Sequence, residues 1–207
     1  MSLSPLSLDL VLTTGLPALA FAAVMVGSPG PANMAFLASG AAVGYRRTVP
    51  FIIGAISGFM VLIVALAAGL GEALERLPAL ALAMKIASSV YILYLAYKIA
   101  TAPVTDVGTA KPAVGFWPGT VVHPLNPKAW AMQLTALSQF IDPASPYWPQ
   151  ALFVMLAFLV VAFPLNSAWA LAGRGVRSLI HRPDRLRALN ITLAVLTVLV
   201  VGVALVL

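Results

Sequence analysis

The chain has 207 residues, of which 61% are hydrophobic and 9% charged, and its mean hydropathy is +1.01. This composition excludes an ordinary soluble domain and predicts an all-α integral membrane protein, a single transmembrane domain over 1–207 embedded in the lipid bilayer. The net charge of +6 is interpreted as a sign of membrane orientation rather than nucleic-acid binding, and the absence of cysteine excludes disulfides, thiolate metal sites and thiol catalysis.

The first apolar segment carries no charge over residues 10–45, which is too long for one membrane crossing. A continuous helix of these 36 residues would be about 54 Å long, against a hydrocarbon core of about 30 Å. Pro29, Gly30 and Pro31 interrupt the segment and remove helical hydrogen bonds, which lipid cannot replace. We therefore predict a broken helix at these residues, with a substrate site at the break.

The chemistry of such a break suits a zwitterion. Pro29 and Pro31 would leave the carbonyls of Met25 and Gly27 without helical donors, and those oxygens could bind an ammonium group. The helix that restarts after the break would present backbone N–H groups near Asn33, where the positive end of the helix dipole favours a carboxylate. Both ends of an amino acid could thus be bound without an acidic side chain.

Charge-poor runs predict six crossings, separated by short connections. Three crossings per half require the second half to insert upside down, so we expect two inverted repeats, about 1–105 and 112–207, with broken helices at the first and fourth crossings. The crossings are expected at residues 8–28, 48–70, 77–97, 113–141, 147–172 and 188–207, and the connections at 44–47, 71–76, 101–111, 142–146 and 173–187.

The positive charges are distributed unevenly among the connections. Nine of the 12 Lys and Arg residues fall in the first, third and fifth connections, counting Lys98 directly before the third, whereas Arg76 alone lies in the others. Because basic short loops stay in the cytoplasm, both termini are expected outside. Lys85 and Lys128 are the two cations left within crossings, and Lys85 is close enough to the end of its crossing to reach the interface.

The fourth predicted crossing carries a second cluster of breaks in the run HPLNPK, which begins at His123 and ends at Lys128. Pro124 and Pro127 would leave the carbonyls of Thr120 and His123 without helical donors. Lys128 lies near the middle of the crossing, where a charge is expensive. It could neutralise a substrate carboxylate, titrate during transport, or donate to the broken backbone and hold the two halves together. His123 could relay protons or simply pack.

Amide and glycine residues mark further positions of interest. Asn33 and Asn126 flank the two breaks and are expected to contact substrate, whereas Asn166 could serve either the pathway or helix packing. Two glycine pairs at four-residue spacing, Gly40 with Gly44 and Gly54 with Gly58, indicate close helix packing or a dimer contact.

The residue types absent from the crossings restrict the mechanism. No Asp or Glu lies deep in a crossing, which argues against a buried carboxylate for ion coupling, a metal site, or a strongly cationic substrate. No phosphate-binding loop is present, so a gradient rather than a nucleotide should drive transport, and no cofactor is expected.

The motifs also resemble a known family. The run GSPGPAN at residues 27–33, the run NPKA at 126–129 and the run SQF at 138–140 resemble the LysE/RhtB family of amino-acid exporters, and the resemblance covers the whole chain. The runs YKIAT at 97–101 and ALS at 136–138 are most similar to the cysteine and O-acetylserine exporter branch. The resemblance implies amino-acid export across the bacterial inner membrane, proton exchange, six helices and a homodimer.

The residues predict a secondary exporter of small neutral amino acids or derivatives, and the resemblance implies a substrate of the cysteine/O-acetylserine or homoserine/threonine kind and proton antiport. A channel or ion permease is the alternative within transport. An intramembrane enzyme with His123 and Lys128 as acid and base, and a non-transporting scaffold, are the alternatives of other classes. The expected substrate and translocation residues are Pro29, Gly30, Pro31, Asn33, His123, Asn126, Pro127, Lys128 and Asn166, with no catalytic residue and no metal.

Overall fold

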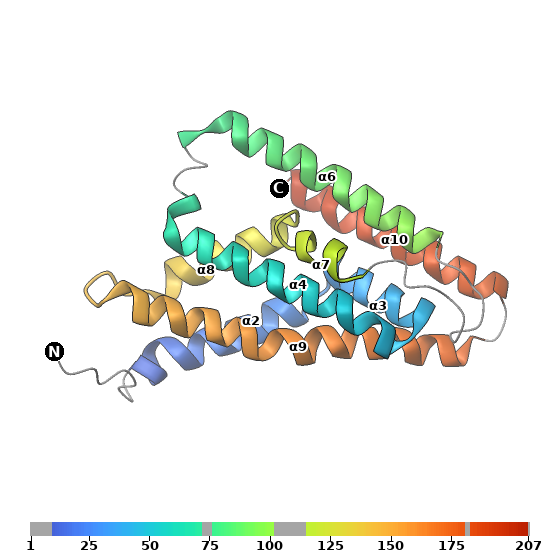
Figure 1. Cartoon of the computed structure of the whole chain (residues 1–207), viewed down its shortest axis with the longest axis horizontal. Helices are drawn as coiled ribbons and strands as arrows, with labels where there is room; N and C mark the ends of the chain where they lie inside the picture. The colour runs from blue at the N-terminus through green and yellow to red at the C-terminus, as the bar shows by residue number, and fades with distance from the viewer. Residues whose placement is uncertain (1–9, 72–75, 102–114, 181–182, 207) are drawn as a thin grey trace.

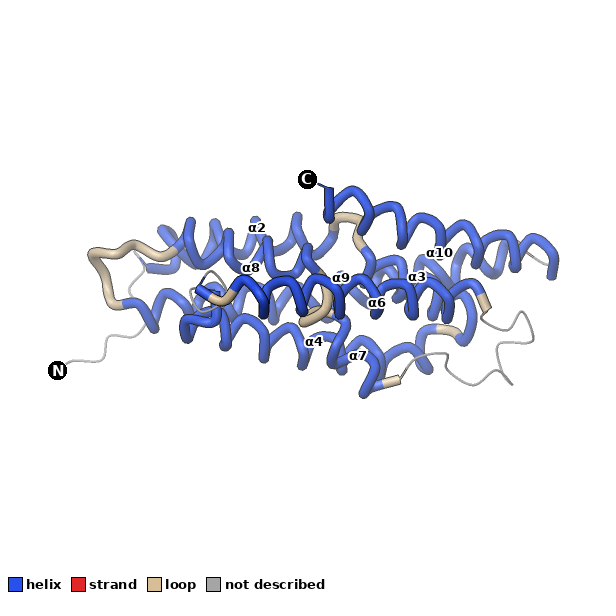
Figure 2. The backbone as a smooth tube through the Cα atoms, turned by 90° about the horizontal axis from the view of Figure 1, so that it is seen from above, coloured by secondary structure: helices blue, strands red, loops and turns tan. Residues whose placement is uncertain are grey.

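The computed structural model describes residues 10–71, 76–101, 115–180 and 183–206, and all regular structure within these ranges is helical (Figures 1 and 2). Eight α-helices are accompanied by two one-turn π-helical segments, η1 and η2. In chain order the elements are η1 Val11–Gly15, α2 Leu16–Gly27, α3 Pro31–Val43, α4 Tyr45–Ala65, η2 Leu66–Leu70, α6 Pro78–Ala100, α7 Phe116–Val122, α8 Pro127–Phe140, α9 Tyr147–Leu179 and α10 Pro183–Val206.

Among the described residues, two helices are long and apolar enough on their own to cross a membrane: the continuous stretch Tyr45–Leu70, which joins α4 to η2, and α9. A third span is formed if η1, α2 and α3 count as one bent helix. Its two parts, Val11–Gly27 and Pro31–Val43, meet at an angle of 58°, so the predicted break at Pro29 and Gly30 is confirmed. A second interruption separates α7 from α8 at residues 123–126, inside the predicted fourth crossing.

The hydrophobic core consists of two main clusters along the bundle. One contains Phe36 and Phe51, whose rings are 5.2 Å apart, and the other contains Phe59 and Phe158, whose rings are also 5.2 Å apart. Helix α4 contributes to both clusters, because Phe51 and Phe59 are two turns apart on the same helix. The polar site of the protein lies beside α4, near the stretch from Phe51 to Phe59.

Helix α3 packs closely against α9 through glycine on both sides, and Figures 1 and 2 show the two helices side by side. A Cβ placed on Gly40 would lie 1.9 Å from the Ala170 carbonyl oxygen, and one on Gly173 would lie 1.9 Å from that of Leu37. Neither distance is sterically allowed, so only glycine permits this approach. The predicted packing role of Gly40 is confirmed.

Helices α4 and α7 form a second close pair. A Cβ on Gly54 would lie 2.1 Å from the Phe116 carbonyl oxygen, and one on Gly58 would lie 1.8 Å from that of Thr120. Pro124 cannot donate to the Thr120 carbonyl, and this freed oxygen lies against Gly58 instead. Gly54 and Gly58 are therefore packing residues, as the sequence predicted.

Two predicted connections are shorter in the structure. Residues 44–47 were expected to form a loop, but α4 begins at Tyr45 and Gly44 alone joins it to α3. The φ of Gly44 is +80°, a conformation that glycine adopts without strain, so its role is a sharp reversal rather than helix packing. The predicted connection 173–187 is also mostly helical, because α9 continues to Leu179 and α10 begins at Pro183.

The connection between α8 and α9 confirms the predicted turn at residues 142–146. The Gln150 side chain, which is only 2% exposed, organises this turn. It accepts a hydrogen bond from the Asp142 backbone N–H (2.8 Å) and donates to the carbonyls of Asp142 (3.1 Å), Ser145 (3.3 Å) and Pro146 (3.1 Å). One buried amide thus ties the end of α8 to the start of α9.

Candidate functional site

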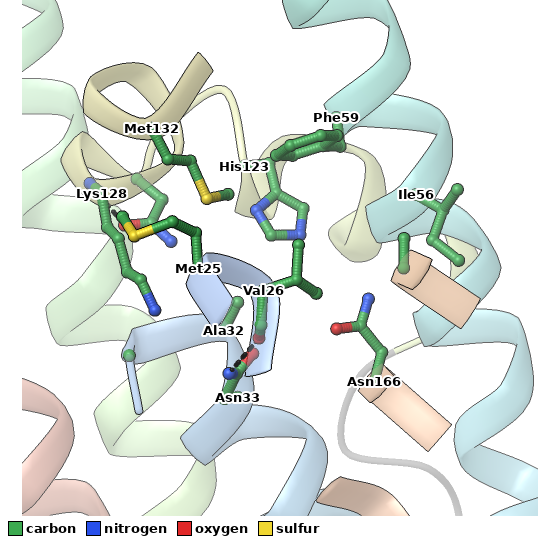
Figure 3. A pocket seen from close by; sticks show the side chains of 13 residues that line it. Met25, Val26, Ala32, Asn33, Ile56, Phe59, His123, Lys128, Met132 and Asn166 are labelled. Atoms are coloured by element: carbon green, nitrogen blue, oxygen red, sulfur yellow. Dashed lines mark hydrogen bonds between the residues drawn. The ribbon is translucent and has the colours of Figure 1, made fainter. Parts of the chain in front are cut away.

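A pocket lies where the two helix breaks meet, and it contains about 390 Å³ of empty space, part of it continuous with the outside. Six segments contribute to it: α2, the first break with α3, α4, the second break, α8 and α9. The lining residues are Met25, Val26, Gly30, Ala32, Asn33, Ile56, Phe59, His123, Asn126, Lys128, Met132, Ala162 and Asn166 (Figure 3).

The structure brings most of the predicted site residues together in this pocket. Gly30 and Asn33 from the first break, His123, Asn126 and Lys128 around the second break, and Asn166 from α9 are all among its lining residues. The three prolines of the prediction, Pro29, Pro31 and Pro127, shape the backbone at the breaks and are not part of the lining.

Side chains satisfy the last carbonyls of α2, as a helix end buried in a membrane requires. The Ser28 hydroxyl donates to the Met25 carbonyl (2.9 Å), and the Trp169 indole N–H from α9 donates to the Gly27 carbonyl (3.2 Å). These are the two oxygens that the sequence predicted to be open to an ammonium group. The protein's own donors occupy both, so the open acceptors must be sought elsewhere at the break.

Asn33 and Lys128 converge on the remaining carbonyls of the break. The Asn33 amide donates to the carbonyls of Val26 (2.8 Å) and Ser28 (2.7 Å). The Lys128 ammonium donates to the Ser28 carbonyl (2.7 Å), the Ser28 hydroxyl (2.9 Å) and the Pro29 carbonyl (3.2 Å). Lys128 therefore joins the second break to the first across 100 residues of sequence.

Asn126 organises the second break. Its side-chain oxygen accepts from the Lys128 backbone N–H (3.1 Å), which caps the first turn of α8, and its own N–H donates to the His123 carbonyl (3.0 Å). The Trp130 indole N–H donates to the Pro124 carbonyl (2.8 Å). The predicted opening at the His123 carbonyl is thus closed by the backbone, and Lys128 projects from the first turn of α8, directly after the break.

Two buried polar atoms of the pocket have no hydrogen-bond partner in the described part of the chain. They are Nδ1 of His123, a residue that is 7% exposed, and Oδ1 of Asn166, which is 2% exposed. The His123 ring stands edge-on to Phe59 with 5.0 Å between ring centroids, and Figure 3 shows both polar side chains turned toward the pocket. A buried polar atom without a partner costs about 1–3 kcal/mol, so these two atoms are suited to meet a solute.

The pocket also presents one helix N-terminus without a cap. Gly30 precedes α3 in an extended conformation (φ −172°), and no side chain caps the helix there. Ala32 and Asn33 in its first turn line the pocket, so the positive end of the α3 dipole faces the enclosed space. No Asp or Glu is among the lining residues. The site therefore offers a positive helix end, an ammonium and neutral polar groups.

Sequence reasoning missed part of the lining. Ile56 and Phe59 on α4 contribute an apolar wall, but apolar residues on an apolar helix give no contrast by which to single them out. Ser28 was missed although its hydroxyl stands directly beside Pro29, and that position in a break was a usable signal.

Lys85 lies on α6, and its side chain is outside the described part of the chain.

Comparison with known proteins identifies the family. A family model described as LysE type translocator matches residues 23–207. The chain belongs to the LysE type translocator family. It is 34% identical over 174 residues to the cysteine/O-acetylserine efflux protein of Salmonella typhimurium strain LT2, and 33% identical over 174 residues to that of Escherichia coli strain K12. Each match covers 83% of this chain and 87% of the relative. No solved structure matches the chain.

Membership of the LysE family confirms the resemblance seen in the sequence motifs. It makes the chain a membrane protein of amino-acid efflux and a transporter rather than an enzyme. The all-helical fold of the described residues agrees with this assignment. A pocket at the meeting point of two broken helices is also the position where secondary transporters of several folds bind their substrates.

Proposed function

We propose that this LysE-family protein exports a small neutral amino acid or derivative by proton antiport. Cysteine and O-acetylserine are the first candidates, because the relatives at 33–34% identity carry these names, and homoserine and threonine are the second. The observation that carries the proposal is the pocket between the two breaks, in which His123 Nδ1 and Asn166 Oδ1 have no hydrogen-bond partner among the described residues.

The pocket has a complementary feature for each part of such a solute. The uncapped N-terminus of α3 suits the carboxylate, and the carbonyls of Ser28 and Pro29, which bind the Lys128 ammonium in this structure, suit an ammonium group. Asn166 Oδ1 can accept a hydrogen bond from a neutral hydroxyl or thiol, and His123 Nδ1 can accept from the same groups or, when it carries the ring proton, donate to an ester. A cationic side chain would meet no carboxylate among the lining residues, which favours a neutral substrate.

The same proposal includes the architecture of two inverted three-helix repeats, about 1–105 and 112–207, within a single transmembrane domain. Helices α6 and α10 have 23 and 24 residues and are each about 35 Å long, sufficient to span a bilayer. The pair α7 and α8 is interrupted as α2 and α3 are, so that each half would contain one broken and two continuous crossings.

We place the protein in the bacterial inner membrane with both termini outside and as a homodimer. The helix ends that carry Arg46, Arg47, Lys98, Arg174 and Arg177 gather at one end of the bundle, on the right in Figure 1. Basic residues concentrated at one end favour the cytoplasmic side for that end. The homodimer rests on the family resemblance, and crosslinking in native membranes tests it.

The experiment is flux in vesicles reconstituted with the full chain. Labelled O-acetylserine, cysteine, homoserine and threonine are each followed with and without a pH gradient, and Lys98→Gln, which alters a cation outside the pocket, is the control. We expect saturable flux with counterflow that a pH gradient drives uphill for at least one substrate. Flux without saturation or counterflow would identify a channel, and a complete lack of solute-dependent flux or stabilisation would leave only the scaffold alternative.

A further inference from the structure

We propose that the Lys128 ammonium occupies the place of the substrate's own ammonium, so that the proton on Lys128 and the bound substrate exclude each other. This inference rests on the proposed export function and assigns its coupling to one lysine. Among the roles that the sequence left open for Lys128, it unites the bond to the broken backbone with titration during transport, and it excludes binding of the carboxylate.

The coordination of Lys128 Nζ carries the inference. A protonated lysine has three N–H donors, and three acceptors surround this one: the Ser28 carbonyl at 2.7 Å, the Ser28 hydroxyl at 2.9 Å and the Pro29 carbonyl at 3.2 Å. The primary ammonium of an amino acid has the same three donors and the same charge. The oxygens at the break therefore form an ammonium site that the protein fills with its own side chain.

The shape of the first break is adapted to this lysine. A Cβ on Gly30 would lie 2.9 Å from Cδ and 3.2 Å from Nζ of Lys128, so any other residue at position 30 would press against the docked side chain. Figure 3 shows Lys128 reaching from α8 to the segment between α2 and α3. The approach is thus direct, and Lys128 Nζ occupies the hydrogen-bonding positions that a second ammonium would need.

The charges around the site disfavour the presence of the Lys128 ammonium and the substrate ammonium at the same time. The groups that contact Lys128 Nζ are neutral dipoles, and His123 is the other titratable side chain among the pocket residues. The walls contributed by α4 and α9 add Ile56, Phe59, Ala162 and Asn166, none of which is charged. Dipoles of one site can stabilise one cation in a membrane interior, and no carboxylate of the lining residues is available to compensate a second ammonium on the same oxygens.

Exchange of the Lys128 proton for the substrate couples the transport of one substrate molecule to that of one proton. When a zwitterion enters, the N–H bond of Lys128 breaks, its proton passes to water on the open side, and the neutral amine leaves the break. The substrate ammonium takes the three acceptors, and the substrate carboxylate lies at the N-terminus of α3. The zwitterion brings no net charge and one proton leaves, so each substrate carried outward returns one proton inward.

Proton release on binding tests this inference in the purified full chain. O-acetylserine binding is measured by calorimetry between pH 5.5 and 7.5 in buffers that differ in ionisation enthalpy, for the wild-type protein and for Lys128→Met. For the wild type we expect one proton released per substrate bound and a Kd that falls tenfold per pH unit. The Lys128→Met variant should still bind, with no proton release and no pH dependence.

A second ligand tests the wild-type protein without any mutation. The compound 3-acetoxypropionate is O-acetylserine without its amino group, so it should bind without releasing a proton. His123→Gln serves as the comparison for the other titratable group and should keep the tenfold slope even if its affinity falls. A slope that is lost in His123→Gln would assign the proton to His123 and overturn the inference.

The remaining outcomes separate this inference from the export function. Transport by the wild type without proton release on binding would refute the exclusion and leave export intact. Loss of all binding in Lys128→Met, with the variant folded by its thermal unfolding profile, would show that Lys128 holds the carboxylate and would also refute it. Failure of every tested amino acid to bind or move in the wild type would instead refute the proposed function.

Discussion

The contact between Gly58 and the Thr120 carbonyl provides a sharp test of the α4–α7 packing. In Gly58→Ala the new Cβ would lie 1.8 Å from that oxygen and 2.7 Å from its carbon. Contacts below 3.0 Å do not occur for real Cβ atoms, so the helices must part by about 1.2 Å. Overpacking of this kind costs about 1–3 kcal/mol, and because the clash is with backbone we expect the upper part of that range.

The matched control is Gly175→Ala on α9, because a Cβ there meets nothing within 4 Å. Both changes improve helix propensity by up to about 1 kcal/mol, so their difference isolates the clash. Thermal unfolding in detergent should place Gly58→Ala about 4–12 °C below Gly175→Ala, at about 2–4 °C per kcal/mol. Equal midpoints for the two variants would refute the packing argument.

Three further substitutions test the breaks and the pocket. Asn33→Ala leaves two main-chain carbonyls of the first break with fewer donors and should lower stability by about 1–3 kcal/mol in thermal unfolding. Asn166→Leu removes a buried oxygen without a partner, so stability should hold or rise while cysteine flux in vesicles is lost; a loss of stability together with retained flux would contradict its assignment to the pocket. Gly44→Ala places a side chain at φ +80° and should cost about 1–3 kcal/mol relative to Gly175→Ala, and an unchanged midpoint would contradict the need for glycine at this reversal.

Sequence reasoning was strongest where the backbone itself was the signal. Pro29 and Gly30 had to interrupt an apolar segment longer than a bilayer, and the structure bends there by 58°. The run around Asn126 indicated the second break for the same reason, and the two breaks line one pocket. Proline and glycine act through local sterics, so their consequences follow from sequence without knowledge of the fold.

The partners of the freed groups could not be predicted in the same way. Trp169 reaches the Gly27 carbonyl from 142 residues away, and no sequence signal indicated it. A bond from Lys128 to the broken backbone was one of the roles left open by the sequence, but the sequence did not indicate that Ser28, 100 residues away, would accept it. Such contacts depend on how the helices are placed in three dimensions, which local patterns do not specify. The extension of α9 past its predicted end has another cause, because charged residues such as Arg174 continue a helix beyond its apolar stretch.

The side-chain amide of Gln150 makes the turn between α8 and α9 rigid. Because four hydrogen bonds hold the turn, we expect α8 and α9 to move as one unit, so that a tilt of one helix also tilts the other. Lys128 lies on α8 and Asn166 on α9, so the two residues would move together when the cavity changes the side to which it opens. Movement of α8 and α9 relative to the rest of the bundle would then concentrate at the helix break beside Pro29.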